Sequence, residues 1–159
     1  MLLKGNIMKK FLAAFVLGLA VASPTFAHVT ITDPWVLATV PQQMATGAFL
    51  AITSSQDAKL IEARSTIANT VELHKMAMTG NIMKMRPVSH IDLPAGKTVK
   101  LEPKAYHIML LSLKGQVKVG EMVPLTLIVE NKYGKRESVV VKAVARSPSG
   151  AMSSDPHHQ

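Results

Sequence analysis

Histidine and methionine residues gather in one stretch of this chain, and together they form a donor set for a soft metal ion. Five of the ten methionines lie between residues 76 and 109, and two of the six histidines, His74 and His107, bracket this cluster. Neutral, polarisable thioethers favour Cu(I) over zinc, magnesium or calcium ions. The alternative is that the methionines fill gaps in a core and the histidines form ordinary hydrogen bonds. The members of the cluster are His74, Met76, Met78, Met83, Met85, His107 and Met109.

The spacing within the cluster favours β-strands that present several donors on one face. Residues two apart on a strand point the same way and are separated by roughly 6.6 Å along the chain. His74, Met76 and Met78 would then share one face, and His107 would project together with Met109. We therefore expect each strand of the cluster to place its donors on a single side.

A glycine-asparagine pair at 80–81 provides the turn that joins two of these strands. It predicts a hairpin of residues 70–79 and 82–91, which brings Met85 back toward His74. The site is complete if the fold also places the end of the strand that carries His107 and Met109 near this hairpin.

The absence of cysteine narrows the chemistry further. It excludes disulfide scaffolds, zinc–cysteine sites, iron–sulfur clusters, cysteine nucleophiles and blue-copper centres, which need a thiolate. A free thiol would be oxidised outside the cytosol, whereas thioethers bind Cu(I) there without forming disulfides. The donor set therefore suits an exported protein.

The first 27 residues have the features of a secretory signal peptide. A charged segment at 8–10 precedes the apolar run 11–22, and residues 23–27 contain a proline and small residues at the cleavage positions. The run is shorter than the roughly 20 residues of a transmembrane helix. We therefore expect a periplasmic protein without stable membrane insertion after cleavage, the alternative being a retained anchor. Met1 and Met8 are both compatible starts.

Composition points to one domain that does not bind nucleic acid. The 159 residues carry a net charge of +8, partly from leader lysines, and contain one tryptophan. The remaining cations are scattered and no glycine-rich phosphate loop is present. A hydrophobic content of 48% excludes a wholly disordered chain.

Short apolar or alternating segments separated by turn residues predict an all-β fold. No helical stripe extends over more than two turns, and the segments recur at roughly 8–15 residues, which is typical of a Greek-key β-sandwich or barrel. We place this domain at 28–146, followed by a disordered tail at 147–159. The expected strand segments are 29–31, 48–52, 59–61, 71–73, 82–85, 98–101, 106–113, 125–130 and 138–144.

The spacing of four donors resembles the signature of the periplasmic copper chaperones called PCuAC. Ten residues separate His74 from Met85, a further twenty-one separate Met85 from His107, and Met109 completes a His-x-Met pair. The surrounding sequence is also similar to this family, over about 28–146. The matching segments are 27–30 with Trp35, 46–49, 71–74, 83–88 and 123–127.

The resemblance implies a cupredoxin-like sandwich that binds one Cu(I) through His74, Met85, His107 and Met109. It also implies delivery of copper to the dinuclear copper centre of cytochrome c oxidase, with the copper-bearing subunit or another copper-assembly protein as partner. Met76 occupies a place where the family varies, so it is an auxiliary candidate. Copper scavenging, resistance or storage would use the same ligands and is the alternative function; a binding sandwich without metal is a third.

Two further copper sites are conceivable outside the cluster. After cleavage, the amine and imidazole of His28 would chelate Cu(II), as in histidine-brace oxygenases, but no second histidine is paired with it, so we do not expect an enzyme. Met152, His157 and His158 form a candidate Cu(II) site in the tail, the alternative being a solvated end.

Overall fold

The computed structural model describes residues 28–151, which form ten strands and one short helix. The elements are β1 (Val29–Leu37), β2 (Ala45–Ser54), β3 (Ala58–Arg64), β4 (Ala68–Thr79), β5 (Ile82–Pro87), β6 (Ile91–Leu93), β7 (Thr98–Leu101), β8 (Tyr106–Leu113), β9 (Met122–Asn131), β10 (Arg136–Arg146) and α1 (Pro148–Ala151).

The all-β prediction is confirmed, and every expected strand segment falls within an observed strand. The sequence reading missed β6, a strand of three residues that is too short to show a period. The single turn of α1 occupies the start of the segment expected to be disordered, and the rest of that tail lies outside the described residues. No helix within residues 28–151 has the length and apolar character needed to cross a membrane.

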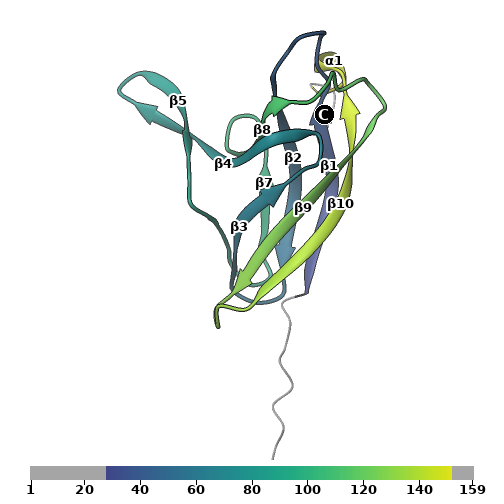
Figure 1. Ribbon diagram of the computed structural model, residues 1–159. Helices are drawn as coiled ribbons and strands as arrows, with labels where there is room; N and C mark the ends of the chain where they lie inside the picture. The colour runs from purple at the N-terminus through teal and green to yellow at the C-terminus, as the bar shows by residue number, and fades with distance from the viewer. Residues whose placement is uncertain (1–27, 152–159) are drawn as a thin grey trace, which may run out of the picture.

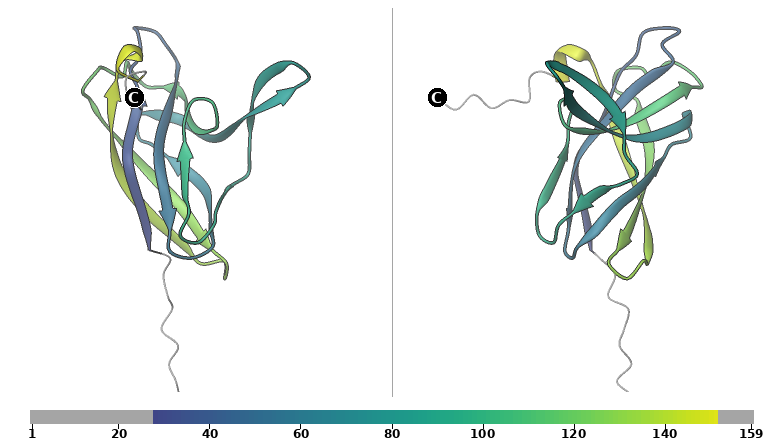
Figure 2. Two further views of the ribbon diagram at one scale, coloured as in Figure 1. Left: turned by 180° about the vertical axis from the view of Figure 1, so that it is seen from behind. Right: turned by 90° about the vertical axis from the view of Figure 1, so that its left-hand side faces the viewer.

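Hydrogen bonds join the described strands into one continuous sheet, which curls around a common core (Figures 1 and 2). The strand order is β5-β4-β8-β7-β2-β1-β10-β9-β3-β6, with β8 also pairing β2. Neighbouring strands are antiparallel except for β1 with β10 and β7 with β8. The sandwich is therefore one sheet folded over on itself, with β1 linking its two halves.

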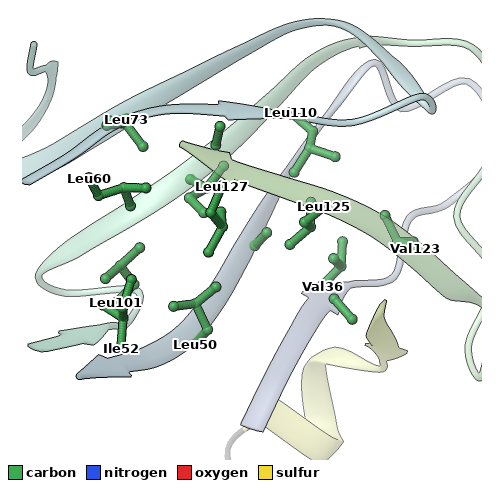
Figure 3. Packing of buried hydrophobic residues seen from close by; sticks show 14 of the residues in the cluster. Val36, Leu50, Ile52, Leu60, Leu73, Leu101, Leu110, Val123, Leu125 and Leu127 are labelled. Atoms are coloured by element: carbon green, nitrogen blue, oxygen red, sulfur yellow. The ribbon is translucent and has the colours of Figure 1, made fainter. Parts of the chain in front are cut away.

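The core is built from alternate residues of strands on both sides of the fold (Figure 3). Leu50 of β2 and Leu127 of β9 are buried there, and each such side chain stabilises the fold by roughly 1.5–3 kcal/mol. Leu73 of β4 and Ile108 and Leu110 of β8 point into the same core. Because side chains alternate along a strand, the residues between them face outward.

A β-bulge in β1 sets which residues of this strand face outward. One extra residue lies between the pairs Thr32–Ala51 and Trp35–Phe49, and Asp33 within it has a φ of +47°. A one-residue shift exchanges the two faces of a strand. Trp35 therefore lies on the outer face beside Phe49, while the next residue enters the core.

An ion pair joins this bulge to the end of β10. The guanidinium of Arg146 donates hydrogen bonds to the carboxylate of Asp33 and lies 5.5 Å from the centre of the Trp35 ring. These hydrogen bonds hold the pKa of Asp33 below its usual value, against the opposing effect of partial burial.

Candidate metal centre

Three adjacent strands, β5, β4 and β8, carry the candidate donors. His74 on β4 lies directly opposite His107 on β8, and Met76 on β4 lies opposite Met85 on β5. Directly opposed residues in an antiparallel pair point to the same side of the sheet. Strand pairing therefore gathers both imidazoles and both thioethers on the outer face.

Met109 completes the group from the other side of the histidine pair. It lies opposite Glu72 on β4, two residues before His74. The donors thus occupy three successive rows across the strands, with the two imidazoles in the middle row. Met85 and Met109 belong to the rows on either side.

The hairpin register differs in detail from the expected one. Met85 pairs with Met76, whereas Pro87 is the residue opposite His74. Met76 is therefore next to His74 along β4 and diagonal to His107, while Met85 is one strand farther away. β5 ends at Pro87, short of the expected end of the hairpin at residue 91, and proline has no N–H to donate to the ladder.

The turn of this hairpin follows from two residues. Gly80 has a φ of +62°, which the first position of a type II′ turn requires and which glycine adopts without a steric penalty. Thr79 and Ile82 form the last pair before the turn. The outer part of β4 and all of β5 extend from the sandwich as an arm (Figures 1 and 2).

The two imidazoles lie close together at the base of this arm. Their ring centres are 5.8 Å apart and their planes are inclined at 65°. His107 is buried, and the side chain of His74 is only 13% exposed.

Each imidazole has one nitrogen held by the protein and one nitrogen without a partner. Nε2 of His74 donates to the carboxylate of Glu72 at 2.7 Å, and Nδ1 of His107 donates to the carbonyl of Ala105 at 3.3 Å. Nδ1 of His74 and Nε2 of His107 are buried and have no hydrogen-bond partner. Buried polar atoms are rarely left unpaired, and a metal ion would satisfy both of these.

Burial favours the neutral form of the His107 imidazole, which is the form that binds a metal. Desolvation lowers the pKa of His107, the hydrogen bond to Ala105 opposes this shift, and the nearby charge of His74 adds to it. A neutral ring leaves the lone pair of Nε2 available to a metal.

An aromatic wall closes the inner side of the site. The rings of Trp35 and Phe49 are 4.3 Å apart, and Phe49 lies 6.4 Å from the ring of His107. Gly47, opposite Met109, leaves the space that the Phe49 ring occupies, since a Cβ there would approach that ring to 2.7 Å. The wall limits access of water to the imidazoles from this side.

The methionine side of the site is open. Met76 and Met109 are half-buried, and Met78, Met83 and Met85 are exposed. Within the described residues no group of three histidine, aspartate or glutamate side chains is placed to hold a metal. Any metal bound between the imidazoles would therefore take its further ligands from the thioethers.

His28 is not part of this group. The backbone N–H of His28 donates to the side chain of Ser55, which follows the end of β2. Gly47, the β2 residue opposite Met109, lies at least seven residues earlier on this strand, so His28 is roughly 23 Å from the candidate donors. Met152, His157 and His158 lie outside the described residues. A surface pocket of about 490 Å³ beside Asp57 and Glu130 contains neither histidine nor methionine.

Sequence reasoning did not assign roles to Glu72 or to the aromatic wall. Glu72 precedes His74 by two residues, so strand parity would have placed its carboxylate on the donor face. The contact of Phe49 with His107 could not be anticipated, because it depends on the pairing of β2 with β8 and on the bulge that turns Trp35 outward.

Residues 29–143 match the family described as "Putative lipoprotein LpqE-like". The "Putative lipoprotein Lxx21020" of Leifsonia xyli subsp. xyli is 30% identical over 100 residues, which cover 62% of this chain. The matched stretch spans 60% of the length of that relative.

Solved structures with the same fold include PCuAC domains. The apo PCuAC domain from PmoF1 has a TM-score of 0.61 at 20% identity, covering 77% of this chain and all of that domain. The copper-bound PCuAC domain from PmoF2 has a TM-score of 0.60 at 20% identity, with 78% and 100% coverage.

Apo-DR1885 from Deinococcus radiodurans is 27% identical, with a TM-score of 0.54 over 90% of this chain and 97% of that protein. The chain therefore belongs to the LpqE-like family and has the cupredoxin-like fold of a PCuAC domain, as its resemblance to the PCuAC family implied.

Proposed function

We propose that this protein is a copper carrier, not an enzyme, that binds one Cu(I) tightly on the outer face of β4, β5 and β8. The ligands are Nδ1 of His74, Nε2 of His107 and the sulfurs of Met85 and Met109, with Met76 as an auxiliary donor. Two imidazoles and neutral thioethers form a soft set that prefers Cu(I) to Cu(II).

The observation that carries this proposal is the pair of buried, unpartnered nitrogens on opposed histidines. Their other nitrogens are already held by Glu72 and Ala105, so both lone pairs are oriented before the metal arrives. A structural pair of histidines would be expected to use these nitrogens in hydrogen bonds. The copper held by the PmoF2 domain of the same fold supports the choice of metal.

Competition for Cu(I) against a chromogenic chelator tests the ligand set. Met85→Leu and Met109→Leu should each weaken binding steeply, because the sulfur is lost while volume is kept and folding changes by less than about 1.5 kcal/mol. Met122→Leu is the control, since Met122 is an exposed methionine on β9, outside the site. Binding as tight as wild type in both site variants would refute the assignment.

Met76→Leu tested in the same way separates the two β-hairpin donors. The register places Met76 closer to both imidazoles, whereas the family spacing favours Met85. A larger loss in Met85→Leu than in Met76→Leu supports the four-ligand set; the reverse order would exchange their roles.

We further propose that the protein is exported to the periplasm and delivers its copper to the dinuclear centre of cytochrome c oxidase, directly or through another copper-assembly protein. The lipoprotein description of its family supports export. The test is transfer of Cu(I) from the loaded protein to the isolated copper-bearing subunit. Retention of copper in the presence of that acceptor would favour scavenging or storage.

The tail supplies a weaker Cu(II) site in this proposal. The adjacent imidazoles of His157 and His158 would chelate Cu(II), and each residue whose backbone is fixed on binding would cost roughly 1–2 kcal/mol. Deletion of residues 147–159 should remove one Cu(II) equivalent and leave tight Cu(I) binding unchanged. If Cu(II) binding survives, the amine of His28 becomes the better candidate.

A further inference from the structure

The arm formed by β4 and β5 carries a second pair of methionines beyond the candidate centre. Met78 lies directly opposite Met83, one row outward from the pair Met76–Met85. We call these two pairs the methionine ladder, with Met76–Met85 as its inner pair and Met78–Met83 as its outer pair. All four side chains point to the same side of the hairpin as His74.

The outer pair has the geometry to close on one ion. Directly opposed residues have Cβ atoms about 4.5–5.5 Å apart, and methionine has three rotatable bonds, so its sulfur can swing toward a partner. Two sulfurs on facing strands can therefore converge without any movement of the backbone.

Packing does not explain these two methionines. Met78 is 62% exposed and Met83 is 47% exposed, so neither gains much from burial. The opposite face of the same arm carries Lys75, Lys84 and Arg86, which shows that this hairpin accommodates charged residues. Met78 and Met83 are thus apolar side chains exposed to water, at positions where solvation would favour polar residues.

The surroundings of the outer pair select a soft ion. Residues 73–91 contain no aspartate or glutamate, so the described arm provides no carboxylate to attract calcium, magnesium or zinc. The cations on the far face disfavour any nearby positive ion, which weakens the site without changing its preference. Neutral sulfur donors bind Cu(I), or its analogue Ag(I), more readily than Cu(II).

We propose that Met78 and Met83 form a second, weaker Cu(I) site on the exposed part of the arm. The site rests on the proposed function only for the identity of its natural ion. It is separate from the tight centre, because Met78 and Met83 lie two rows outward from the imidazole pair, beyond the row of Met76 and Met85.

The test is an anaerobic titration of protein labelled with ¹³C at the methionine methyl groups. The first Cu(I) equivalent should shift the signals of the tight centre, and further Cu(I) should shift those of Met78 and Met83 together. The double variant Met78→Leu/Met83→Leu lacks these two signals; it should keep the first step and bind no second Cu(I) equivalent. The proposal is overturned if the Met78 and Met83 signals of the wild type stay in place up to three equivalents, or if the double variant still binds a second Cu(I) equivalent.

A matched control removes two exposed methionines that have no methionine opposite them. Met44 and Met122 are 57% and 53% exposed, and Met122 faces Val144. Met44→Leu/Met122→Leu should retain both steps; loss of the second step there would show adventitious binding by exposed thioethers and overturn the proposal.

A second variant keeps the result independent of the tight centre. In Met85→Leu/Met109→Leu the first step should weaken, while the Met78 and Met83 signals should still respond. If the tight centre proves not to bind Cu(I), the proposed function fails, yet the response of these two signals still decides the outer site.

Discussion

At the scale of single residues, the candidate centre depends on what each imidazole does with its two nitrogens. Glu72 and Ala105 hold one nitrogen of His74 and His107, respectively, and leave the other as a lone pair. Partners of this kind set the tautomer and orientation of metal-binding histidines. In the proposed copper site, the carboxylate of Glu72 would therefore position the ligand His74 without itself binding the metal.

Removing this carboxylate should weaken Cu(I) binding while the number of bound ions stays the same. We expect Glu72→Ala to lose about 10–100-fold in affinity, the usual effect of losing such a partner. Glu72→Gln should lose less, because its amide oxygen still accepts from Nε2. Chelator competition measures both, with Glu62→Gln on β3 as a control; equal affinity in all three variants would contradict the role of Glu72.

The buried imidazole of His107 should make the metal-free protein less stable in acid. Its pKa in the folded state is lowered, chiefly by burial, whereas the unfolded chain has a value of about 6.5. Below pH 6.5 the unfolded state therefore binds the proton first, and the free energy of unfolding falls until the folded-state pKa is passed. Above pH 6.5 this contribution is constant.

Urea unfolding at a series of pH values from 7.5 downward measures this effect. His107→Leu should show a shallower decrease than wild type, because the other titrating groups are unchanged. Identical pH dependence in the two proteins would mean that the imidazole of His107 is as easily protonated in the folded state as in the unfolded chain.

At the scale of elements, β4 passes from a buried environment in the sandwich to an exposed one in the arm. Its first half packs Leu73 into the core, and its second half leaves the sandwich as one side of the arm. β5 is exposed throughout and is held by its pairing with β4. The imidazoles lie where the packed half of β4 meets its exposed half. One side of the candidate site is therefore held by the core, and the other side is accessible to solvent.

β2 supports the same site from the other side through Gly47 and Phe49. A Cβ at Gly47 would meet the Phe49 ring at 2.7 Å, and that ring is confined by Trp35. We expect Gly47→Ala to destabilise the fold by about 1–3 kcal/mol through overpacking, and to weaken Cu(I) binding by displacing the wall beside His107. Chemical unfolding and chelator competition measure the two effects.

Gly115→Ala is the matched control for this substitution. Nothing lies within 4 Å of a Cβ built on Gly115, so this variant should keep wild-type stability and binding. Wild-type values in Gly47→Ala would show that the Phe49 ring moves aside at little cost.

At the scale of the whole molecule, the core and the candidate centre occupy opposite faces of the same strands. Leu73 of β4 and Leu110 of β8 are buried inside the curled sheet (Figure 3). His107 and Met109 lie on the opposite face of β8. The core therefore maintains the strand pairing that defines the candidate site, while its side chains point to the opposite face of the sheet. Stability and copper affinity should consequently be separable.

Leu127→Ala tests this separation. It should lower the free energy of unfolding by about 2–5 kcal/mol, because it leaves a cavity in the core. At temperatures well below unfolding, its Cu(I) affinity should match wild type to within about 0.5 kcal/mol, as expected for distant, independent sites. A large loss of affinity would show that core packing controls the geometry of the ligands.

Local sequence patterns were sufficient to predict much of this architecture. Alternating apolar residues identify the strands, and the turn at Gly80 identifies the hairpin, because both depend on neighbours in the chain. Parity along each strand also predicted that His74 and Met76 share a face. The cupredoxin-like class followed from the resemblance of the donor spacing to a known family.

Long-range pairing decided the remaining features. The opposition of His74 to His107 requires β4 to pair with β8, which no local pattern specifies. The bulge at Asp33 turns Trp35 outward, and a single inserted residue of this kind leaves no signal in the alternation. The exact rows of Met85 and Pro87 likewise depend on register, because a shift of one residue moves every side chain to the other face.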